Sequence, residues 1–207
     1  MGIITNPSLL GTVSGKVGNL VVVKWKDKTI IRETPEPRRT PVRETELRNW
    51  SNFSILHHWL KPIIKFLRAG FNGYPGASHA FNAAKSVALK NAFEGKPKVF
   101  NPALVQVSWG DLPLPANITV EKKDEKELWF SWDVTSDSSH PHDQAMLLAY
   151  DPVGKNKVYE ITGQFRNTGS DKLVLEEKGN YHVYIAFVAA DRSRQSVSLY
   201  LGCITVD

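Results

Sequence analysis

The stretch ELWFSWDV (residues 127–134) decides the fold class of the larger part of this chain. Its alternate residues Leu128, Phe130 and Trp132 are large and apolar. Successive side chains of a strand point to opposite faces, so these three are expected to face a core while Trp129 points to the other side. The stretch therefore predicts a half-buried β-strand.

Similar short runs continue from residue 101 to the end of the chain, each bounded by turn residues. The others are ALVQVSW, NITVEKK, AMLLAYD, KVYEITG, DKLVLEE, YHVYIAFVAA and SVSLYLGCITV. Runs of this length and spacing predict an antiparallel β-sandwich of seven or eight strands over residues 101–207.

Residues 1–100 begin with a different pattern. The segment NLVVVKWKDKTIIRETP (19–35) is rich in β-branched residues and is interrupted by Lys-Asp-Lys. It predicts a hairpin with strands near 20–24 and 29–33. The preceding GTVSGKVGN (11–19) resembles a phosphate-binding loop, but that loop needs four residues between its glycines, a Ser or Thr after the lysine and a following helix. All three are absent, so we expect no phosphate site here.

A long helix is predicted after Thr40-Pro41, which supply an N-cap and a first-turn proline. Apolar residues at spacings of three and four form one stripe: Leu47, Trp50, Phe53, Leu56, Leu60, Ile63 and Leu67. Pro62 predicts a kink. A second helix is expected from Ser78 to Phe93, completing a helical hairpin. The chain is thus predicted to be α+β, with a hairpin-and-helix region at 1–100 and the sandwich at 101–207.

The charged residues are also distributed differently between residues 1–100 and residues 101–207. Residues 1–100 contain 16 Lys and Arg against 6 Asp and Glu, whereas residues 101–207 contain 10 against 15. Such asymmetry indicates two regions that have different partners or attract each other in an assembly. The N-terminus lacks signal-peptide features, and no apolar run is long enough to cross a bilayer. We therefore expect a cytoplasmic protein without a membrane partner.

Residues suited to chemistry are few. The single Cys203 lies in a strand-like run and is expected to be a small buried hydrophobe. His57, His58 and His79 do not have the i, i+4 spacing of a helical zinc pair. The group His140, His142 and Asp143 has a spacing for weak metal binding but no second ligand cluster in the sequence. We expect no cofactor, no metal and no catalytic residue.

The C-terminal region resembles a fibronectin type III domain. LWFSWDV matches the strand that ends in a core tryptophan, and Leu175, six positions before Tyr181, has the spacing of the tyrosine corner. Glu177 stands where that family commonly has a proline two positions after the leucine. The resemblance covers residues 117–207 and implies a fibronectin-like or immunoglobulin-like sandwich.

A second resemblance spans most of the chain. GKVGN, the hairpin, ELRNWSNF, AFNAA and VQVSWGDLPLP are similar to an uncharacterised family of Bacteroidetes proteins. The basic segment PRRTPVRETELR (37–48) also partly resembles linkers of small structural proteins encoded in prophages. The resemblance implies the two-part bacterial architecture and brings no established activity.

Three functions remain open. The first is a non-catalytic structural or interaction protein that binds a protein partner or assembles with itself. The second is nucleic-acid binding by the basic half, through Arg38, Arg39, Arg43, Arg48, Lys61, Lys65 and Arg68. The third is a glycan-binding or glycan-hydrolysing module.

Hydrolysis of glycans would need paired carboxylates facing one cleft. The only dense acidic group is Asp133, Asp137, Asp143 and Asp151. Exposed Trp25 or Trp129 would instead favour a carbohydrate or protein surface, because accessible aromatic rings supply stacking area. We expect the non-catalytic role.

Overall fold

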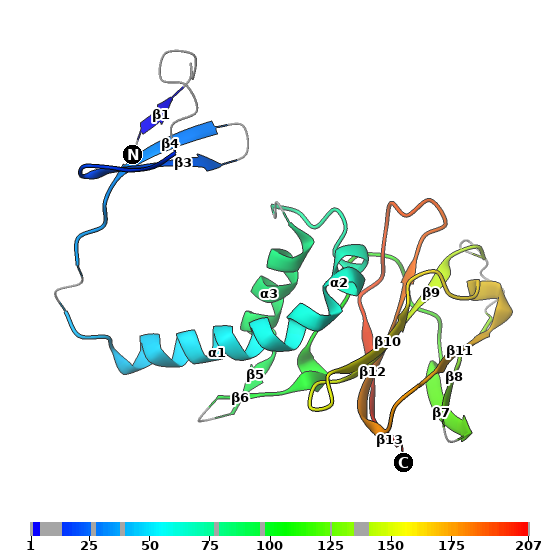
Figure 1. Cartoon of the computed structure of the whole chain (residues 1–207). Helices are drawn as coiled ribbons and strands as arrows, with labels where there is room; N and C mark the ends of the chain where they lie inside the picture. The colour runs from blue at the N-terminus through cyan, green and yellow to red at the C-terminus, as the bar shows by residue number, and fades with distance from the viewer. Residues whose placement is uncertain are drawn as a thin grey trace. The chain divides into compact units, whose positions relative to one another are not determined.

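The computed structural model describes residues 2–4, 14–25, 28–37, 40–76, 79–95, 98–124, 126–134 and 141–206. The chain divides into two compact units, which we call the N-terminal unit (Met1–Glu44) and the C-terminal unit (Thr45–Asp207) (Figure 1). The boundary predicted at residue 100 does not coincide with this division, because the helices after residue 44 pack with the later strands.

The N-terminal unit is a four-stranded antiparallel sheet. Its strand order is β1 (Gly2–Ile4), β4 (Lys28–Glu33), β3 (Leu20–Trp25) and β2 (Gly15–Val17). The predicted hairpin is confirmed as β3 and β4, and the GTVSGKVGN motif supplies β2 and the turn into β3. In that turn Gly18 has φ +58°, a left-handed conformation that favours glycine.

The C-terminal unit begins with helices. The first, α1 (Glu44–Leu60), is followed by a 3₁₀ turn, η2 (Lys61–Ile63), and by α2 (Ile64–Gly70). This confirms the interruption predicted at Pro62. The predicted start at Thr40-Pro41 is wrong, because α1 begins at Glu44 and the two residues lie in the segment before it.

The second predicted helix is α3 (Ala80–Asn91), which starts after His79, while Ser78 lies outside the described residues. A small two-stranded sheet, β5 (Phe93–Glu94) with β6 (Val99–Phe100), follows it. No helix in the described ranges is long and apolar enough to cross a membrane.

Two antiparallel sheets complete the C-terminal unit. One has the order β10 (Asn156–Glu160), β9 (Gln144–Asp151), β12 (Gly179–Val188) and β13 (Leu199–Val206). The other has the order β11 (Ser170–Val174), β8 (Glu127–Ser131) and β7 (Thr119–Asp124). Seven of the eight predicted runs are strands. The eighth, ALVQVSW, is not, because Pro102–Leu104 form a 3₁₀ turn, η3, and the rest is extended without a ladder.

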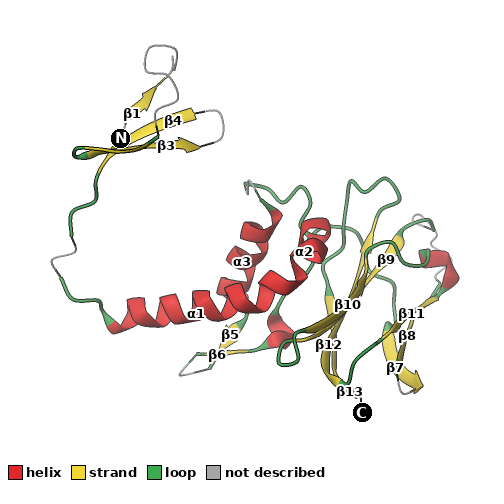
Figure 2. Cartoon of the chain, in the orientation of Figure 1, coloured by secondary structure: helices red, strands yellow, loops and turns green. Residues whose placement is uncertain are grey.

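In the C-terminal unit, the four-stranded sheet β10–β9–β12–β13 is the middle one of three layers. One face packs on the three-stranded sheet through Leu128, Phe130, Leu147 and Ile185 among others. The opposite face packs on the helices through Met146, Leu148, Tyr150, Tyr184 and Ala186. Figure 2 shows the helices along this sheet and the smaller sheet beyond it. As a result, β9 and β12 are buried on both faces rather than alternating.

Aromatic rings join the helices to the sheet. The Trp59 ring meets Tyr150 edge-on, with ring centroids 5.1 Å apart, and Tyr184 at 6.3 Å. The Tyr184 hydroxyl donates a 2.6 Å hydrogen bond to the Pro102 carbonyl, and burial raises the pKa of Tyr184 well above its ordinary value. Edge-to-face contacts of this kind add to the apolar burial and fix the helices in place.

The segment SWGDL (108–112) lies between α2 and the chain after β12. The buried Ser108 hydroxyl lies 2.8 Å from the Ser196 carbonyl oxygen and 3.1 Å from that of Gly70. Asp111 binds the Arg194 guanidinium at 2.9 Å. The segment therefore connects α2 to the chain after β12 through hydrogen bonds and an ion pair.

The predicted tyrosine corner has its hydrogen bond. Leu175 and Tyr181 are fully buried, and the Tyr181 hydroxyl donates a 2.8 Å bond to the Glu177 carbonyl. The bond holds the connection between β11 and β12, which belong to different sheets.

Replacing Tyr181 with phenylalanine removes this bond and leaves the ring packed. We expect the free energy of unfolding of the C-terminal unit to fall by about 1 kcal/mol, the usual net value of one such bond. Urea unfolding followed by near-ultraviolet circular dichroism measures it. An unchanged midpoint and slope would show that the bond contributes nothing to stability.

Candidate functional site

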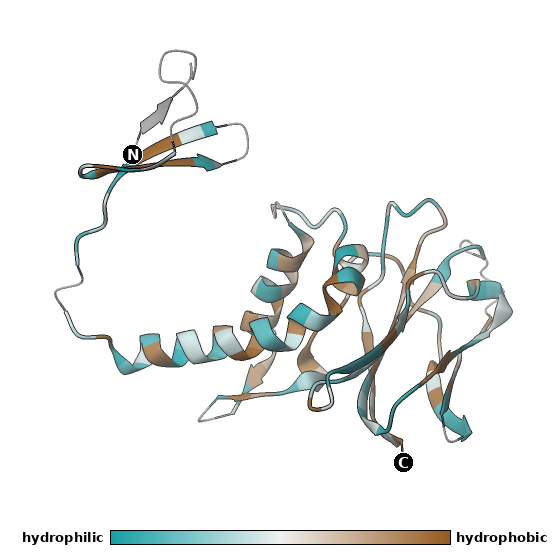
Figure 3. Cartoon of the chain, viewed as in Figure 1, coloured by the Kyte–Doolittle hydropathy of each residue, from teal (hydrophilic) through white to brown (hydrophobic). Residues whose placement is uncertain are grey.

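The apolar stripe of α1 is only half covered. Leu56, Leu60, Ile63 and Leu67 are fully buried, as predicted. The same stripe continues toward the start of the helix, where Leu47, Trp50 and Phe53 are 51%, 56% and 45% exposed. Figure 3 shows apolar positions in both halves of α1. Only the second half of the predicted apolar stripe is therefore buried.

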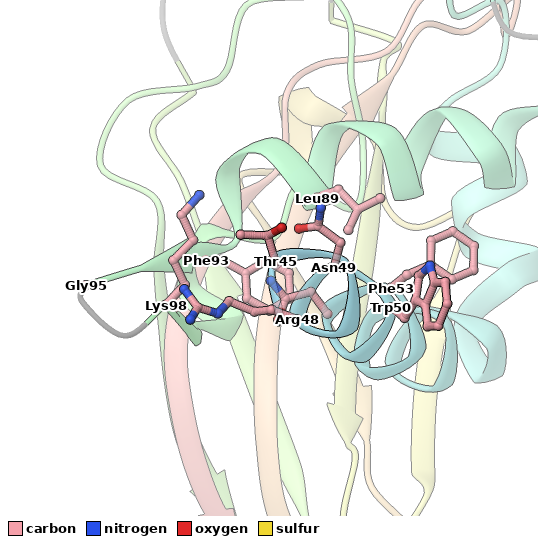
Figure 4. Close-up of a pocket in the computed structure, with 10 residues that line it drawn as sticks. Thr45, Arg48, Asn49, Trp50, Phe53, Leu89, Phe93, Gly95 and Lys98 are labelled. Atoms are coloured by element: carbon pink, nitrogen blue, oxygen red, sulfur yellow. The ribbon is translucent and has the colours of Figure 1, made fainter. Parts of the chain in front are cut away.

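A groove runs beside this uncovered half. It has a volume of about 1080 Å³ and lies between α1, the end of α3 and the β5–β6 hairpin. Its apolar lining is Trp50, Phe53, Leu89 and Phe93, and its polar lining includes Thr45, Asn49 and Asn52. In Figure 4, Trp50 and Phe53 lie together toward one end, and Arg48 and Lys98 lie together toward the other. The groove thus combines an aromatic wall with a cationic end.

The aromatic end is backed by a stacked cluster. The His57 ring is stacked on Phe53, with centroids 6.3 Å apart, and meets Phe81 edge-on at 5.8 Å. The Lys85 ammonium lies 4.8 Å from the centroids of both phenylalanine rings. Burial lowers the pKa of His57, and the neighbouring Lys85 and Lys61 lower it further, which favours the neutral form of the ring. These contacts hold the Phe53 ring in position.

A smaller cavity of about 480 Å³ lies on the other side of α1. It is lined by Ile55, His58 and Trp59 of α1, by Lys61 and Pro62, and by the turn after β9. Its lining is mostly apolar, with Lys61 and Lys155 as its cations. Lys61 therefore faces this cavity and not the larger groove.

The structure does not gather the predicted nucleic-acid residues into one site. Among those that the structure describes, only Arg48 lines the groove. Lys65 and Arg68 are exposed on α2, and Arg43 is exposed in the segment before α1. Arg38 and Arg39 lie outside the described residues.

Trp129, one of the two tryptophans proposed from the sequence as a stacking surface, is not a free ring. Trp129 is half-buried on β8, with the Lys123 ammonium 4.2 Å and the Lys172 ammonium 5.5 Å from its ring centroid. Its indole N–H donates to Glu127 at 3.1 Å. Trp25 ends β3, and its side chain is outside the described part.

Of the acidic residues that the structure describes, Asp143 and Asp151 are too far apart to form a hydrolytic pair. Asp143 precedes β9 and Asp151 ends it, so the strand holds them roughly 25 Å apart, well beyond the spacing of ~5–10 Å that glycoside hydrolysis needs. Asp143 lies 3.6 Å from the Arg166 guanidinium, and Asp133 accepts a 2.6 Å bond from Asn117. Asp137 and His140 lie outside the described residues.

Among the described residues, no group of three His, Cys, Asp or Glu side chains could hold a metal ion. Cys203, expected to be buried, is exposed on β13. It lies on the strand at the edge of the four-stranded sheet, where one side lacks a neighbouring strand.

Comparison with known proteins agrees with the sequence resemblance at the level of the family. A model described as "Family of unknown function (DUF6266)" matches residues 12–202. The chain belongs to this family. No curated protein matches it. Membership in a family without an established activity, as the sequence predicted, is thus confirmed.

Two of the segments that supported the family resemblance have structural explanations. GKVGN forms β2 and the turn into β3, and SWGDL forms the close contact between α2, residues 194–196 and the sheet edge. Neither motif lines the groove. The segment ELRNWSNF (46–53), which also carried the resemblance, contributes five residues to the groove lining: Arg48, Asn49, Trp50, Asn52 and Phe53.

Proposed function

We propose that this protein is a non-catalytic interaction protein that binds a segment of a partner protein in the groove beside α1. The observation that carries the proposal is the exposure of Trp50 and Phe53 on a helix whose continuing stripe is fully buried. Tryptophan and other aromatic residues in a pocket are typical of the residues that supply most binding energy at protein interfaces. A bound partner segment would cover these two exposed aromatic rings.

The lining of the groove indicates what that segment must offer. Its apolar wall requires large apolar side chains, and Lys98 at the other end favours a carboxylate. The groove lining contains no Asp or Glu among its described residues. A segment that carries apolar anchors followed by one or two acidic residues satisfies both ends.

The groove favours a protein over a nucleic acid for a reason of charge. Between Asn49 and Leu60, α1 contains no Lys or Arg, and Lys85 of α3, which lies over the Phe53 ring, is a single cation rather than a row. Nucleic-acid affinity depends on several phosphate contacts that release counterions. The cations of α2 lie on a different element.

We further propose that the sandwich is of the fibronectin type III or immunoglobulin-like kind. Numbered from β7, its first, second and fifth strands form one sheet and its third, fourth, sixth and seventh form the other. The Tyr181 hydrogen bond and the buried Trp132 support this reading. Domains of this kind commonly serve as binding modules.

Selection of short random peptides displayed on phage, with the full chain as bait, tests the groove. We expect the enriched peptides to combine aromatic or aliphatic residues with Asp or Glu. A synthetic copy, titrated by calorimetry, should bind Trp50→Ala about tenfold more weakly or worse, as expected for an interface anchor. Lys98→Glu should weaken binding by removing the cationic end.

Val153→Ala is the matched control, because Val153 is 89% exposed in the turn after β9 and does not line the groove. It should leave binding unchanged. Peptides that bind Trp50→Ala as well as they bind Val153→Ala would refute the groove, as would a failure to enrich any peptide. A random-sequence DNA duplex that binds in low salt and is lost in Lys65→Glu would favour the nucleic-acid alternative instead.

A further inference from the structure

The smaller cavity beside α1, of about 480 Å³, has the size of a small-molecule site. Sites of this kind enclose roughly 300–1,000 Å³ and combine apolar walls with a few polar groups. The rings of Trp59 and Tyr150, which meet edge-on, line it together with Pro62 and Pro152. Flat rings of this kind suit a planar aromatic ligand, because they supply large contact areas. We call this site the Trp59 cavity.

The charged side chains that line the Trp59 cavity are cations. Lys61 opens the 3₁₀ turn after α1, and Lys155 lies in the turn between β9 and β10. Both are exposed, and neither forms an ion pair with a described residue. Asp151 follows Tyr150 and so points to the other face of β9, where it is buried and accepts a 2.9 Å bond from the Val153 N–H. An anion in the cavity would therefore meet two ammonium groups and no carboxylate of the described lining.

Two buried donors that line the cavity lack a partner. The Trp59 side chain is 6% exposed, and its indole N–H has no acceptor among the described residues. The Tyr150 ring is 1% exposed, and its hydroxyl makes no hydrogen bond to a described residue. Burial and the neighbouring Asp151 raise the pKa of Tyr150, so this hydroxyl keeps its proton and can donate. Buried polar groups are nearly always paired, so both donors indicate an acceptor that comes from outside the chain.

We propose that the Trp59 cavity binds a small aromatic carboxylate. The planar body of the ligand packs against the ring and proline walls, and its carboxylate binds Lys61 and Lys155. A charged group is favoured over a neutral one, because two ammonium groups in one cavity repel each other and a counter-ion removes that repulsion. A carboxylate has about four acceptor sites, so it can bind both lysines and still accept from the phenol or the indole.

Calorimetric titration of the full chain with three probes tests the proposal. Naphthaleneacetate offers both the ring and the charge, naphthaleneethanol only the ring, and acetate only the charge. We expect naphthaleneacetate to bind about tenfold more tightly than the alcohol or better, since hydrogen bonds to a charged group contribute this much. Acetate should not bind measurably. Equal affinities of the acid and the alcohol, or no binding of naphthaleneacetate at millimolar concentration, would overturn the proposal.

Charge variants locate the carboxylate. Lys61→Gln and Lys155→Gln should each weaken binding of naphthaleneacetate several-fold, and the double variant should weaken it further. Lys90→Gln is the matched control, because Lys90 is exposed at the end of α3 and lines neither the cavity nor the groove. It should leave the affinity unchanged. An equal loss in Lys90→Gln would show that net charge alone attracts the probe and would contradict the site.

Variants of exposed apolar residues of α1 locate the ring of the probe. Ile55 lines the cavity and is 43% exposed, whereas Leu47 is 51% exposed and lines neither the cavity nor the groove. Ile55→Ala should weaken binding several-fold through lost apolar contact, and Leu47→Ala should not. Trp50→Ala, which alters the groove, should also leave the affinity for naphthaleneacetate unchanged. The outcome is therefore independent of the peptide experiment.

The indole signals in proton–nitrogen correlation spectra report where the probe lies. After assignment of the tryptophans, we expect addition of naphthaleneacetate to move the Trp59 signal, because that ring lines the cavity. The Trp129 signal should stay, since β8 belongs to the sheet on the far side of the sandwich. A Trp59 signal that stays while that of Trp50 or Trp129 moves would place the probe elsewhere and overturn the proposal.

Discussion

Replacing Gly110 with alanine should lower the free energy of unfolding of the C-terminal unit by about 3 kcal/mol or more, since overpacking of a closed site costs about 1–3 kcal/mol and occasionally more. An added Cβ would lie 1.9 Å from the Gln195 carbonyl oxygen and 2.6 Å from its carbonyl carbon. Both atoms belong to backbone, so no side chain can turn away. Urea unfolding followed by circular dichroism measures the change.

Gly73→Ala is the control, because it separates steric overlap from backbone strain. Gly73 has φ +72° and open space around the added Cβ, so alanine there should cost only about 1–2 kcal/mol for its left-handed conformation. Gly110 does not have a positive φ and should nevertheless cost more. Equal costs at the two positions would contradict a close approach of the backbones at Gly110.

Replacing Trp132 with alanine should cost about 3–5 kcal/mol, the range for deletion of a buried aromatic side chain. The Trp132 ring is 5% exposed and meets Phe187 edge-on, with centroids 5.2 Å apart. Its indole N–H donates a 2.8 Å bond to the Arg166 carbonyl. The variant therefore leaves a cavity in place of the indole ring and also loses the hydrogen bond. Thermal unfolding of the full chain measures the loss.

Trp129→Ala also removes a tryptophan side chain from ELWFSWDV, but from the face opposite to that of Trp132. Its ring is half-buried and flanked by lysines, so we expect a loss of about 1–2 kcal/mol, from two exposed cation–π contacts and partial burial. If Trp132→Ala destabilises no more than Trp129→Ala, the side facing the core has been assigned wrongly.

The strands could be predicted because each carries a local signal. Alternation in ELWFSWDV places Leu128, Phe130 and Trp132 in the core, as observed. The runs of β9 and β12 are apolar almost throughout, which is typical of strands covered on both faces. The helices that cover the second face lie far away in the sequence, so the third layer could not be predicted from these runs alone.

The predictions that were wrong failed because a local sequence pattern does not show which elements lie next to it in the fold. ALVQVSW has the alternation of a strand, but its backbone contacts run to Gly70 and Ser198 and no neighbouring strand pairs with it. The stripe of α1 has the spacing of a core helix along its whole length. Spacing shows which side chains share a face and says nothing of where the neighbouring elements end. The exposed residues of α1 that line the groove belong to the part of the stripe that extends past the neighbouring elements.

The contact of Trp59 with Tyr150 joins residues about 90 positions apart in the chain, and its contact with Tyr184 spans about 125. During synthesis the helices therefore leave the ribosome well before the strands that cover them. At ~5–20 residues per second, the delay is roughly 5–25 s. Throughout that time the apolar side of α1 and α2 can be covered only by other parts of the nascent chain or by chaperones.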